Sequence, residues 1–182
     1  MALTSTLYPI SLALNDSDRG VYQNLDLRLA CHPSETPEFM MTRLLAYCLA
    51  WEEGIRFTEG LSSGEQCAVQ VQDLTGRITH WIEVGAPSAE RLHRGSKLAG
   101  RASVYTHRDP AKVLANLCGQ RIYQAEQIPL THFSDELPAR MAAALERRSS
   151  LSFSVAGGQI YAELNGQLLE ASVIVEPIET AD

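Results

Sequence analysis

Residues 62–101 constrain the fold more than any other stretch of this 182-residue chain. Two segments of alternating apolar residues, 68–73 and 77–84, flank a turn triplet that ends in glycine, which is typical of a hairpin. A proline and a serine then start a helix expected over residues 89–100. The stretch therefore predicts a strand, a tight turn, a second strand and a basic helix that follows the second strand directly.

The rest of the chain predicts an α/β fold of the α+β kind, with a mixed sheet. Residues 4–14 and 21–31 alternate around a turn-rich segment and predict an opening hairpin, whose first strand Pro9 places at a sheet edge. Residues 151–175 alternate around two glycine-containing turns and predict a C-terminal three-strand meander. The remaining expected strands are 55–58, 102–106 and 121–128, and the remaining expected helices are 37–51, 109–117 and 134–147, the last capped by Ser134.

The overall composition is that of a water-soluble protein. The length fits one domain over residues 1–182. No apolar run approaches the ~20 residues that a membrane span needs, and the N-terminus lacks the charged start of a signal peptide, so a cytoplasmic protein without membrane contact is expected. A net charge of −7 argues against broad affinity for nucleic acid, but leaves room for a small basic patch.

Cysteine and histidine residues give no sign of a zinc site. The four cysteines form no C-x-x-C pair, and free, mostly buried thiols are expected. The five histidines are scattered. His80 alternates with Ile78 and Ile82 along one strand, so a partly buried structural histidine is expected there.

The register of the central hairpin decides which carboxylates can meet. Antiparallel pairing around the turn puts Glu83 opposite a residue near Ala68. Asp73 then lies at the turn, about five residues or ~17 Å along the strand, too far to share a metal ion with Glu83. Glu65, with Gln66 beside it, is the acidic residue expected to approach Glu83.

The basic helix adds positive charge beside Glu83. A helix N-terminus and cationic side chains next to carboxylates suit a site for Mg²⁺ and a phosphate. Two structural alternatives stay open: Glu83 pairs with Arg91 or Arg94, and Glu38, in the first turn of its helix, serves only to favour the helix dipole.

Specific segments of the chain resemble the YaeQ family, and the similarity covers nearly its whole length. The segments are His32-Pro33-Ser34-Glu35-Thr36, then Glu38, Met40, Arg43 and Leu44, and Trp81-Ile82-Glu83-Val84-Gly85 with Pro87, Arg91 and Leu92. This resemblance implies a variant of the restriction-endonuclease-like PD-(D/E)XK fold, whose core is a helix, a three-strand meander, a helix and a strand. The order predicted for residues 36–106 is the same.

The resemblance also implies a set of site residues. Carried over by position, the metal ligands are Glu65 and Glu83, with Gln66 beside them and Glu38 in support. The superfamily lysine falls at Gly85 in this chain, so Lys97 or Arg91 would replace it. The family usually shows Asp-Glu-Pro where this chain has Glu65-Gln66-Cys67, and Gln66 removes one negative charge from the site.

Two functions of different classes follow. The first is a magnesium-dependent phosphodiesterase acting on nucleic acid, in which Lys97, Arg91 and Glu38 are catalytic and Arg94, Arg101 and Gln66 bind substrate. The second is a catalytically inactive nuclease-fold module that binds nucleic acid or an unknown protein partner. The acidic balance, Gly85 and Gln66 favour the second function, but on balance the sequence favours an endonuclease-like protein, with the inactive module as the alternative.

Overall fold

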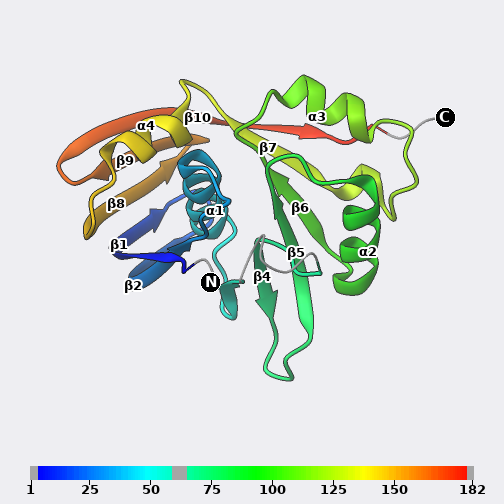
Figure 1. Cartoon of the computed structure of the whole chain (residues 1–182), viewed down its shortest axis with the longest axis horizontal. Coiled ribbons are helices and arrows are strands. Elements are labelled where there is room, and N and C mark those ends of the chain that lie inside the picture. The colour runs from blue at the N-terminus through cyan, green and yellow to red at the C-terminus, as the bar shows by residue number, and fades with distance from the viewer. Residues whose placement is uncertain (1–3, 59–64, 180–182) are drawn as a thin grey trace.

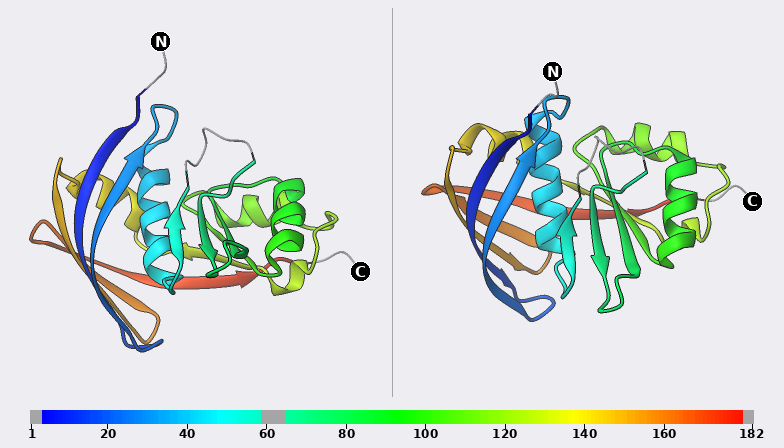
Figure 2. Two further views of the ribbon diagram at one scale, coloured as in Figure 1. Left: turned by 90° about the horizontal axis from the view of Figure 1, so that it is seen from below. Right: turned by 60° about the horizontal axis from the view of Figure 1, so that its bottom comes forward.

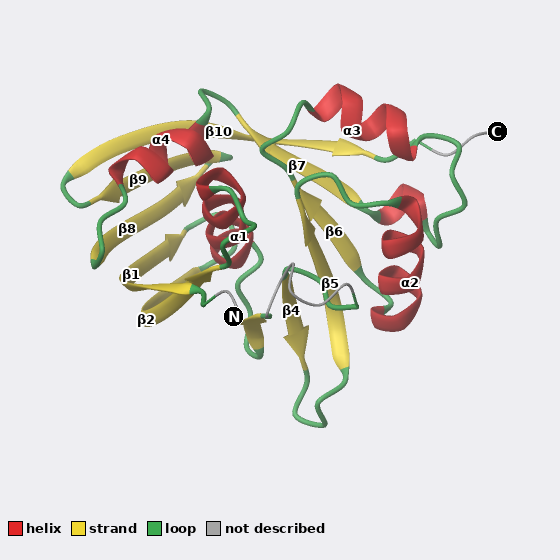
Figure 3. Ribbon diagram, viewed as in Figure 1, coloured by secondary structure: helices red, strands yellow, loops and turns green. Residues whose placement is uncertain are grey.

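The structure, a computed structural model, describes residues 4–58 and 65–179, so the first three residues of the 62–101 stretch lie outside it. Within these residues, ten strands form one mixed sheet in the order β2-β1-β8-β9-β10-β7-β6-β5-β4-β3 (Figures 1 and 3). The strands are β1 (Thr6–Asp16), β2 (Val21–Cys31), β3 (Ile55–Phe57), β4 (Val69–Gln72), β5 (Ile78–Val84), β6 (Ala102–Tyr105), β7 (Pro129–Phe133), β8 (Ser149–Ala156), β9 (Gln159–Leu164) and β10 (Gln167–Pro177). The helices are α1 (Pro37–Leu49), α2 (Ala89–Ala99), α3 (Pro110–Leu117), α4 (Leu137–Ala144) and the short 3-10 helix η2 (Ala125–Gln127).

Strand β10 joins the two halves of the sheet. Its residues 167–172 pair with β9, and its residues 173–177 pair with β7, both antiparallel. One half is the β1–β2 hairpin with the β8–β9–β10 meander, and the other half runs from β7 to β3. Because β10 spans both halves, the sheet curls around α1 instead of lying flat against it (Figure 2).

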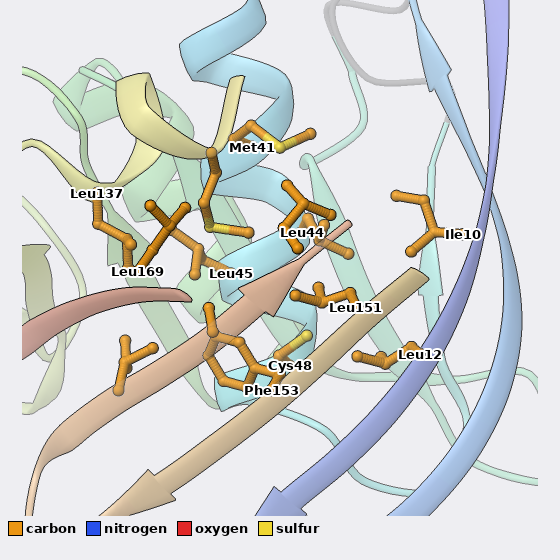
Figure 4. Close-up of a cluster of buried hydrophobic side chains, with 14 of the residues drawn as sticks. Ile10, Leu12, Met41, Leu44, Leu45, Cys48, Leu137, Leu151, Phe153 and Leu169 are labelled. Atoms are coloured by element: carbon orange, nitrogen blue, oxygen red, sulfur yellow. The ribbon is translucent and has the colours of Figure 1, made fainter. Parts of the chain in front are cut away.

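Helix α1 is buried on every side over residues 40–48. One side packs on the hairpin and the meander, where Met41, Leu44 and Leu45 meet Phe153 and its neighbours (Figure 4). The opposite side contributes Ala46 and Tyr47 to a second cluster with β4, β5 and β6. Each large apolar side chain buried in this way stabilises the fold by about 1.5–3 kcal/mol, so α1 holds both halves of the sheet together.

The polar ends of α1 are satisfied by residues from outside the helix. At its start, the Thr36 hydroxyl accepts a hydrogen bond from the Phe39 amide. At its end, Arg19, in the turn of the opening hairpin, donates to the carbonyls of Cys48 and Trp51, each at 3.1 Å. The helix has no basic residue in its own last turn, so Arg19 supplies the positive charge that interacts favourably with the negative, C-terminal end of the helix dipole.

A buried ion pair anchors α1 to the segment before it. Arg43 Nη1 lies 3.0 Å from both carboxylate oxygens of Glu35, and it also donates to the Ala30 carbonyl. Arg43 Nη2 donates to the Thr58 carbonyl, and the guanidinium lies over the Phe57 ring. The His-Pro-Ser-Glu-Thr motif is thus a structural element, since its glutamate holds Arg43.

Helices α2 and α3 cover the outer face of β5, β6 and β7. Trp81, Leu92, Val104 and Leu130 form the centre of this apolar layer. Gly95 lets α2 approach closely, because a Cβ atom there would lie 2.3 Å from the Trp81 ring. This close packing fixes α2 on β5.

Most expected elements are confirmed, including the mixed sheet, the opening hairpin, the central hairpin and the C-terminal meander. The edge position expected from Pro9 is wrong, because β2 is the edge and β1 lies between β2 and β8. Pairing of β1 with β8 begins at Ile10. Pro9 therefore lies just before the part of β1 that is paired on both sides, where a missing N–H is tolerated.

Two expectations in the second half of the chain are wrong. The strand expected at 121–128 is loop and η2, and the strand instead lies at β7. The helix expected from Ser134 to residue 147 is the shorter α4. Ser134 does not cap it, because its hydroxyl accepts a hydrogen bond from the Ser172 amide of β10. Asp135 and Glu136, both at positive φ, turn the chain into α4.

All four cysteines are free, as expected, although Cys118 is exposed and only Cys48 and Cys67 are buried. The described helices include none with the length and apolar character that crossing a bilayer requires.

Breaking the Glu35–Arg43 pair tests the role of α1. Glu35→Ala leaves the Arg43 guanidinium buried without its counter-ion, so the free energy of unfolding should fall by about 3–5 kcal/mol in urea denaturation. The double variant E35L/R43M should recover much of this loss, because it replaces the pair with apolar side chains. Glu53→Ala, at an exposed position, is the control. An E35A variant as stable as this control contradicts the prediction.

Candidate functional site

The largest described cavity lies at the carboxyl ends of two parallel strands. Strands β5 and β6 pair in parallel up to Val84 and Tyr105, and α2 and α3 follow them. A cavity of about 710 Å³ opens at this edge, and we call it the main cleft. Its lining residues are Phe39, Gln66, Ala68, Glu83, Val84, Gly85, Ala86, Pro87, Ser88, Arg91, Arg108, Asp109, Lys112, Val113 and Asn116. Ligands commonly bind where parallel strands end and helices begin.

Glu83 forms a buried part of the cleft wall. Val69 pairs with Ile82, and the Ala68 amide donates to the Ile82 carbonyl, so the predicted register of Glu83 opposite Ala68 is confirmed. The glutamate is only 3% exposed. The same register leaves Asp73 at the hairpin turn, where its carboxylate accepts hydrogen bonds from the turn amides of Thr75 and Arg77.

Both carboxylate oxygens of Glu83 accept hydrogen bonds from N–H groups. Oε1 accepts from Trp81 Nε1 at 2.8 Å and from Arg91 Nε at 3.2 Å, and Oε2 accepts from Arg91 Nη2 at 3.3 Å. Arg91 Nη2 also donates to the Gln66 carbonyl at 2.7 Å. The pairing of Glu83 with Arg91 is therefore the arrangement found, and Arg91 links β5, α2 and the segment before β4.

Burial controls the protonation of Glu83. Loss of solvent raises the pKa of its carboxyl above the ordinary value of 4.5, while the positive charge of Arg91 and the Trp81 hydrogen bond act in the opposite direction. The net effect is a raised pKa, since desolvation is the largest cause. Glu83 thus releases its proton less readily than an exposed glutamate.

The rim of the main cleft is positive. Helix α2 is capped by Ser88 and helix α3 by Asp109, so the N-termini of both helices lie at the cleft. Arg108 and Lys112 extend the positive charge along the α3 side, and the exposed Lys112 ammonium lies 3.8 Å from the Asp109 carboxylate. Together with Arg91 they give the cleft three cationic side chains.

Only some of the site residues predicted from the sequence line the main cleft. It brings Glu83, Arg91 and Gln66 together in the main cleft. Glu65 is exposed and is not among the residues that line the cleft, so its approach to Glu83 stays a prediction. Glu38 lines a neighbouring cavity of about 390 Å³.

The other predicted basic residues lie away from the cleft floor. Lys97 is in the last turn of α2, six residues or ~9 Å along the helix from Arg91. Arg101 precedes β6, at the opposite edge of the sheet, and pairs with Glu52. Arg94 is exposed, and its charge acts on Glu83 from α2.

Sequence reasoning missed the residues on the α3 side of the cleft, mainly Arg108, Lys112 and Asn116. The signal was present, because a strand at 102–106 and a helix from residue 109 were both expected. Parallel strands end at the same edge of a sheet, so the start of α3 had to lie beside the start of α2.

The cleft residues do not fit Mg²⁺ as they are arranged. Magnesium takes oxygen ligands, often one or two carboxylates, whereas three N–H groups already use most of the acceptor positions of the Glu83 carboxylate, and Gln66 is neutral. Among residues 4–58 and 65–179, no three histidine, cysteine or acidic side chains are grouped so as to hold a metal ion. The magnesium assignment stays a prediction.

The raised pKa of Glu83 predicts a pH effect on stability. The folded state holds the Glu83 proton more tightly than the unfolded chain, so its stabilising contribution is complete below pH 4.5 and is lost as pH rises through the folded value. As pH rises from about 4 to 7, the free energy of unfolding should therefore fall less for Glu83→Gln than for wild type. The two falls should differ by up to ~1.4 kcal/mol for each unit by which folding raises the pKa of Glu83. Urea denaturation across this range measures it, with Glu53→Gln as the exposed control. Parallel curves for wild type and E83Q contradict the prediction.

Comparison with known proteins places the chain in a family. Residues 1–173 match the family model described as YaeQ protein. YaeQ of Escherichia coli (strain K12) is 28% identical over 174 residues, covering 95% of this chain and 96% of that protein, and YaeQ of Salmonella typhi is 28% identical over 162 residues, covering 88% and 90%.

Solved structures agree with this match. The crystal structure of YaeQ from Pseudomonas syringae superimposes with a TM-score of 0.85 at 28% identity, covering 94% of this chain and 95% of that one. YaeQ from Xanthomonas axonopodis pv. citri has the same fold, with a TM-score of 0.80 at 23% identity over 98% of this chain and all of that one. The chain therefore belongs to the YaeQ family.

Proposed function

We propose that this protein binds nucleic acid in the main cleft, on a nuclease-like fold. The observation that carries the proposal is the convergence of Arg91, Arg108, Lys112 and two helix N-termini at one sheet edge. In a chain of net charge −7, this local positive charge suits a phosphate backbone and gives a defined place for it.

The order of elements supports the nuclease-like part of the proposal. Helix α1, the antiparallel meander β3–β4–β5, helix α2 and the parallel strand β6 follow one another as in the PD-(D/E)XK core. Glu83 lies near the end of the third strand of that meander, the position where the superfamily carries an acidic ligand. In this chain the acidic group is held by Arg91, which favours binding over cleavage.

Charge reversal on the α3 side tests nucleic acid binding. The double variant R108E/K112E should bind a fluorescein-labelled single strand of about 12 nucleotides at least tenfold more weakly than wild type, because two charge-assisted phosphate contacts become repulsive. Fluorescence anisotropy at low salt measures the affinity. The control R77E/R121E changes the net charge equally, at exposed positions that do not line the cleft. Equal affinities of the two double variants contradict the proposal.

A second candidate is the magnesium-dependent phosphodiesterase with Glu65 and Glu83 as ligands, Glu38 in support, and Lys97 or Arg91 as the catalytic cation. It is favoured by one observation, a buried carboxyl with a raised pKa in the wall of a cleft that has a positive rim. It requires a metal ion to compete with the three N–H donors now on the Glu83 carboxylate.

Cleavage assays decide between the two candidates. Incubation of the protein with single- and double-stranded DNA and RNA and Mg²⁺ or Mn²⁺ should give no product. Neither metal should change the melting temperature of wild type or that of Glu83→Gln. Metal-dependent product that E83Q fails to form, or a metal-dependent rise in melting temperature that E83Q abolishes, would establish the phosphodiesterase and overturn the binding-only proposal.

A further inference from the structure

A second cavity adjoins the main cleft. It has a volume of about 670 Å³ and lies between the opening hairpin, the start of α1 and strands β3 and β4. We call it the side cavity. Gln66 lines both cavities, so the two lie on either side of this residue. The polar residues that matter for binding here are Arg28, His32, Arg43, Arg56 and Gln70.

The side cavity is also positively charged. Arg28 and Arg56 are exposed, and within the described residues neither guanidinium has an ion pair or a hydrogen bond. Arg43 forms the buried wall at 2% exposure, and its Nε is buried without a hydrogen-bond partner among the described residues. Glu35 is the one acidic residue among those that line the cavity, and Arg43 already neutralises it.

The charge therefore continues from one cavity into the other. The lining of the two cavities contains six lysine and arginine residues of the fifteen in the chain, against three acidic residues. Two of these acids, Glu35 and Glu83, are buried in pairs with arginine, and the third, Asp109, caps α3. A ligand with a single phosphate would use only one cavity, whereas a strand with successive phosphates can use both.

We infer that the main cleft and the side cavity form one binding track for single-stranded nucleic acid, passing over Gln66, an inference that rests on the proposed function. Each cavity falls in the size range of sites that enclose one small ligand, which fits a nucleotide unit. Both cavities reach into the protein: Glu83, in the wall of the main cleft, is 3% exposed, and Arg43, in the wall of the side cavity, is 2% exposed. Bases reach such depth when they are unstacked from a duplex, as in single strands.

Two aspects of the lining favour nucleic acid over an acidic peptide. Arginine guanidinium groups, which predominate here, bind phosphate oxygens in pairs and also stack on bases. Phe39, at the start of α1, lines the main cleft and is partly exposed, and its one aromatic ring contact among the described residues is an edge contact with His107, so the remaining ring surface can receive a base. Phe57 in the side cavity cannot do so, because Tyr47 stacks on it and Arg43 covers it.

The test separates the two cavities by ligand length. The double variant R28E/R56E of the full chain should bind a labelled oligothymidylate of about 12 nucleotides at least tenfold more weakly than the control R77E/R121E, by anisotropy. The slope of log affinity against log salt should fall by about 1.4, the value for two lost single-strand phosphate contacts. Thymidine diphosphate is short enough to occupy a single cavity, so R28E/R56E should weaken its binding less than it weakens binding of the oligothymidylate.

Other outcomes would overturn the inference. If R28E/R56E binds the oligothymidylate as the control does while R108E/K112E binds it weakly, the side cavity is not part of the track and the proposed function stands. If neither double variant differs from the control, both fail. Equal or tighter binding of a duplex of the same length, or of a polyglutamate peptide, excludes a single-strand track. Thermal melting of each variant confirms that a loss of binding is not a loss of folding.

Discussion

The fold depends on the burial of α1 from all sides. A helix that packs on a flat sheet needs only one apolar face, but residues 40–48 are buried throughout, so the sheet has to pass around the helix. Strand β10 makes this possible by pairing with β9 in its first part and with β7 in its second. The polar groups at both helix ends would be costly in such a position, and Thr36 and Arg19 supply hydrogen bonds to them, while Glu35 neutralises the buried Arg43 of the helix itself.

The same arrangement creates the candidate site. The N-terminal half of α1 lies where the curled sheet opens, and three of its residues line three different cavities: Phe39 the main cleft, Arg43 the side cavity and Glu38 the third. The close contact of Gly95 with Trp81 sets α2 on β5, and Trp81 and Arg91 from these two elements then hold the Glu83 carboxylate. The packing of α2 on β5 thus places Arg91 beside Glu83, and so decides how the carboxylate in the cleft is neutralised.

Local patterns predicted those parts of the fold that short-range forces determine. The hairpins at 4–31 and 68–84 and the C-terminal meander follow from period-two alternation and glycine turns, and the register that puts Glu83 opposite Ala68 follows from the turn. The errors arise where distant residues compete. Ser134 was expected to cap a helix, but the Ser172 amide takes its hydroxyl, and the apolar residues at 121–128 pack under α2 and α3 without pairing as a strand.

For the candidate site too, the sequence predicted the residues that lie close together in the chain and missed those that come from distant elements. Glu83, Arg91 and Gln66 come from one continuous stretch, and the structure brings them together. Arg108 and Lys112 come from the next strand–helix unit, Arg28 comes from β2 in the other half of the sheet, and Arg56 comes from β3 at the far edge of the same half, so only the three-dimensional arrangement adds them. The family resemblance carried the Glu83 position but not Arg28, Arg108 or Lys112, since these three lie outside the segments that resemble the family.

A cluster elsewhere in the molecule resembles a hydrolase triad, and its geometry shows why it is structural. His80 Nε2 lies 2.8 Å from Ser103 Oγ, and His80 Nδ1 lies 3.6 Å from a Glu52 carboxylate oxygen. However, Ser103 is 3% exposed, and none of the three residues lines a described cavity. Burial and the charge of Arg101 lower the pKa of His80 to about 3, which makes the imidazole too weak a base to take a serine proton near neutral pH. His80 is thus the structural histidine that its strand pattern predicted, and its burial leaves it no access to a ligand.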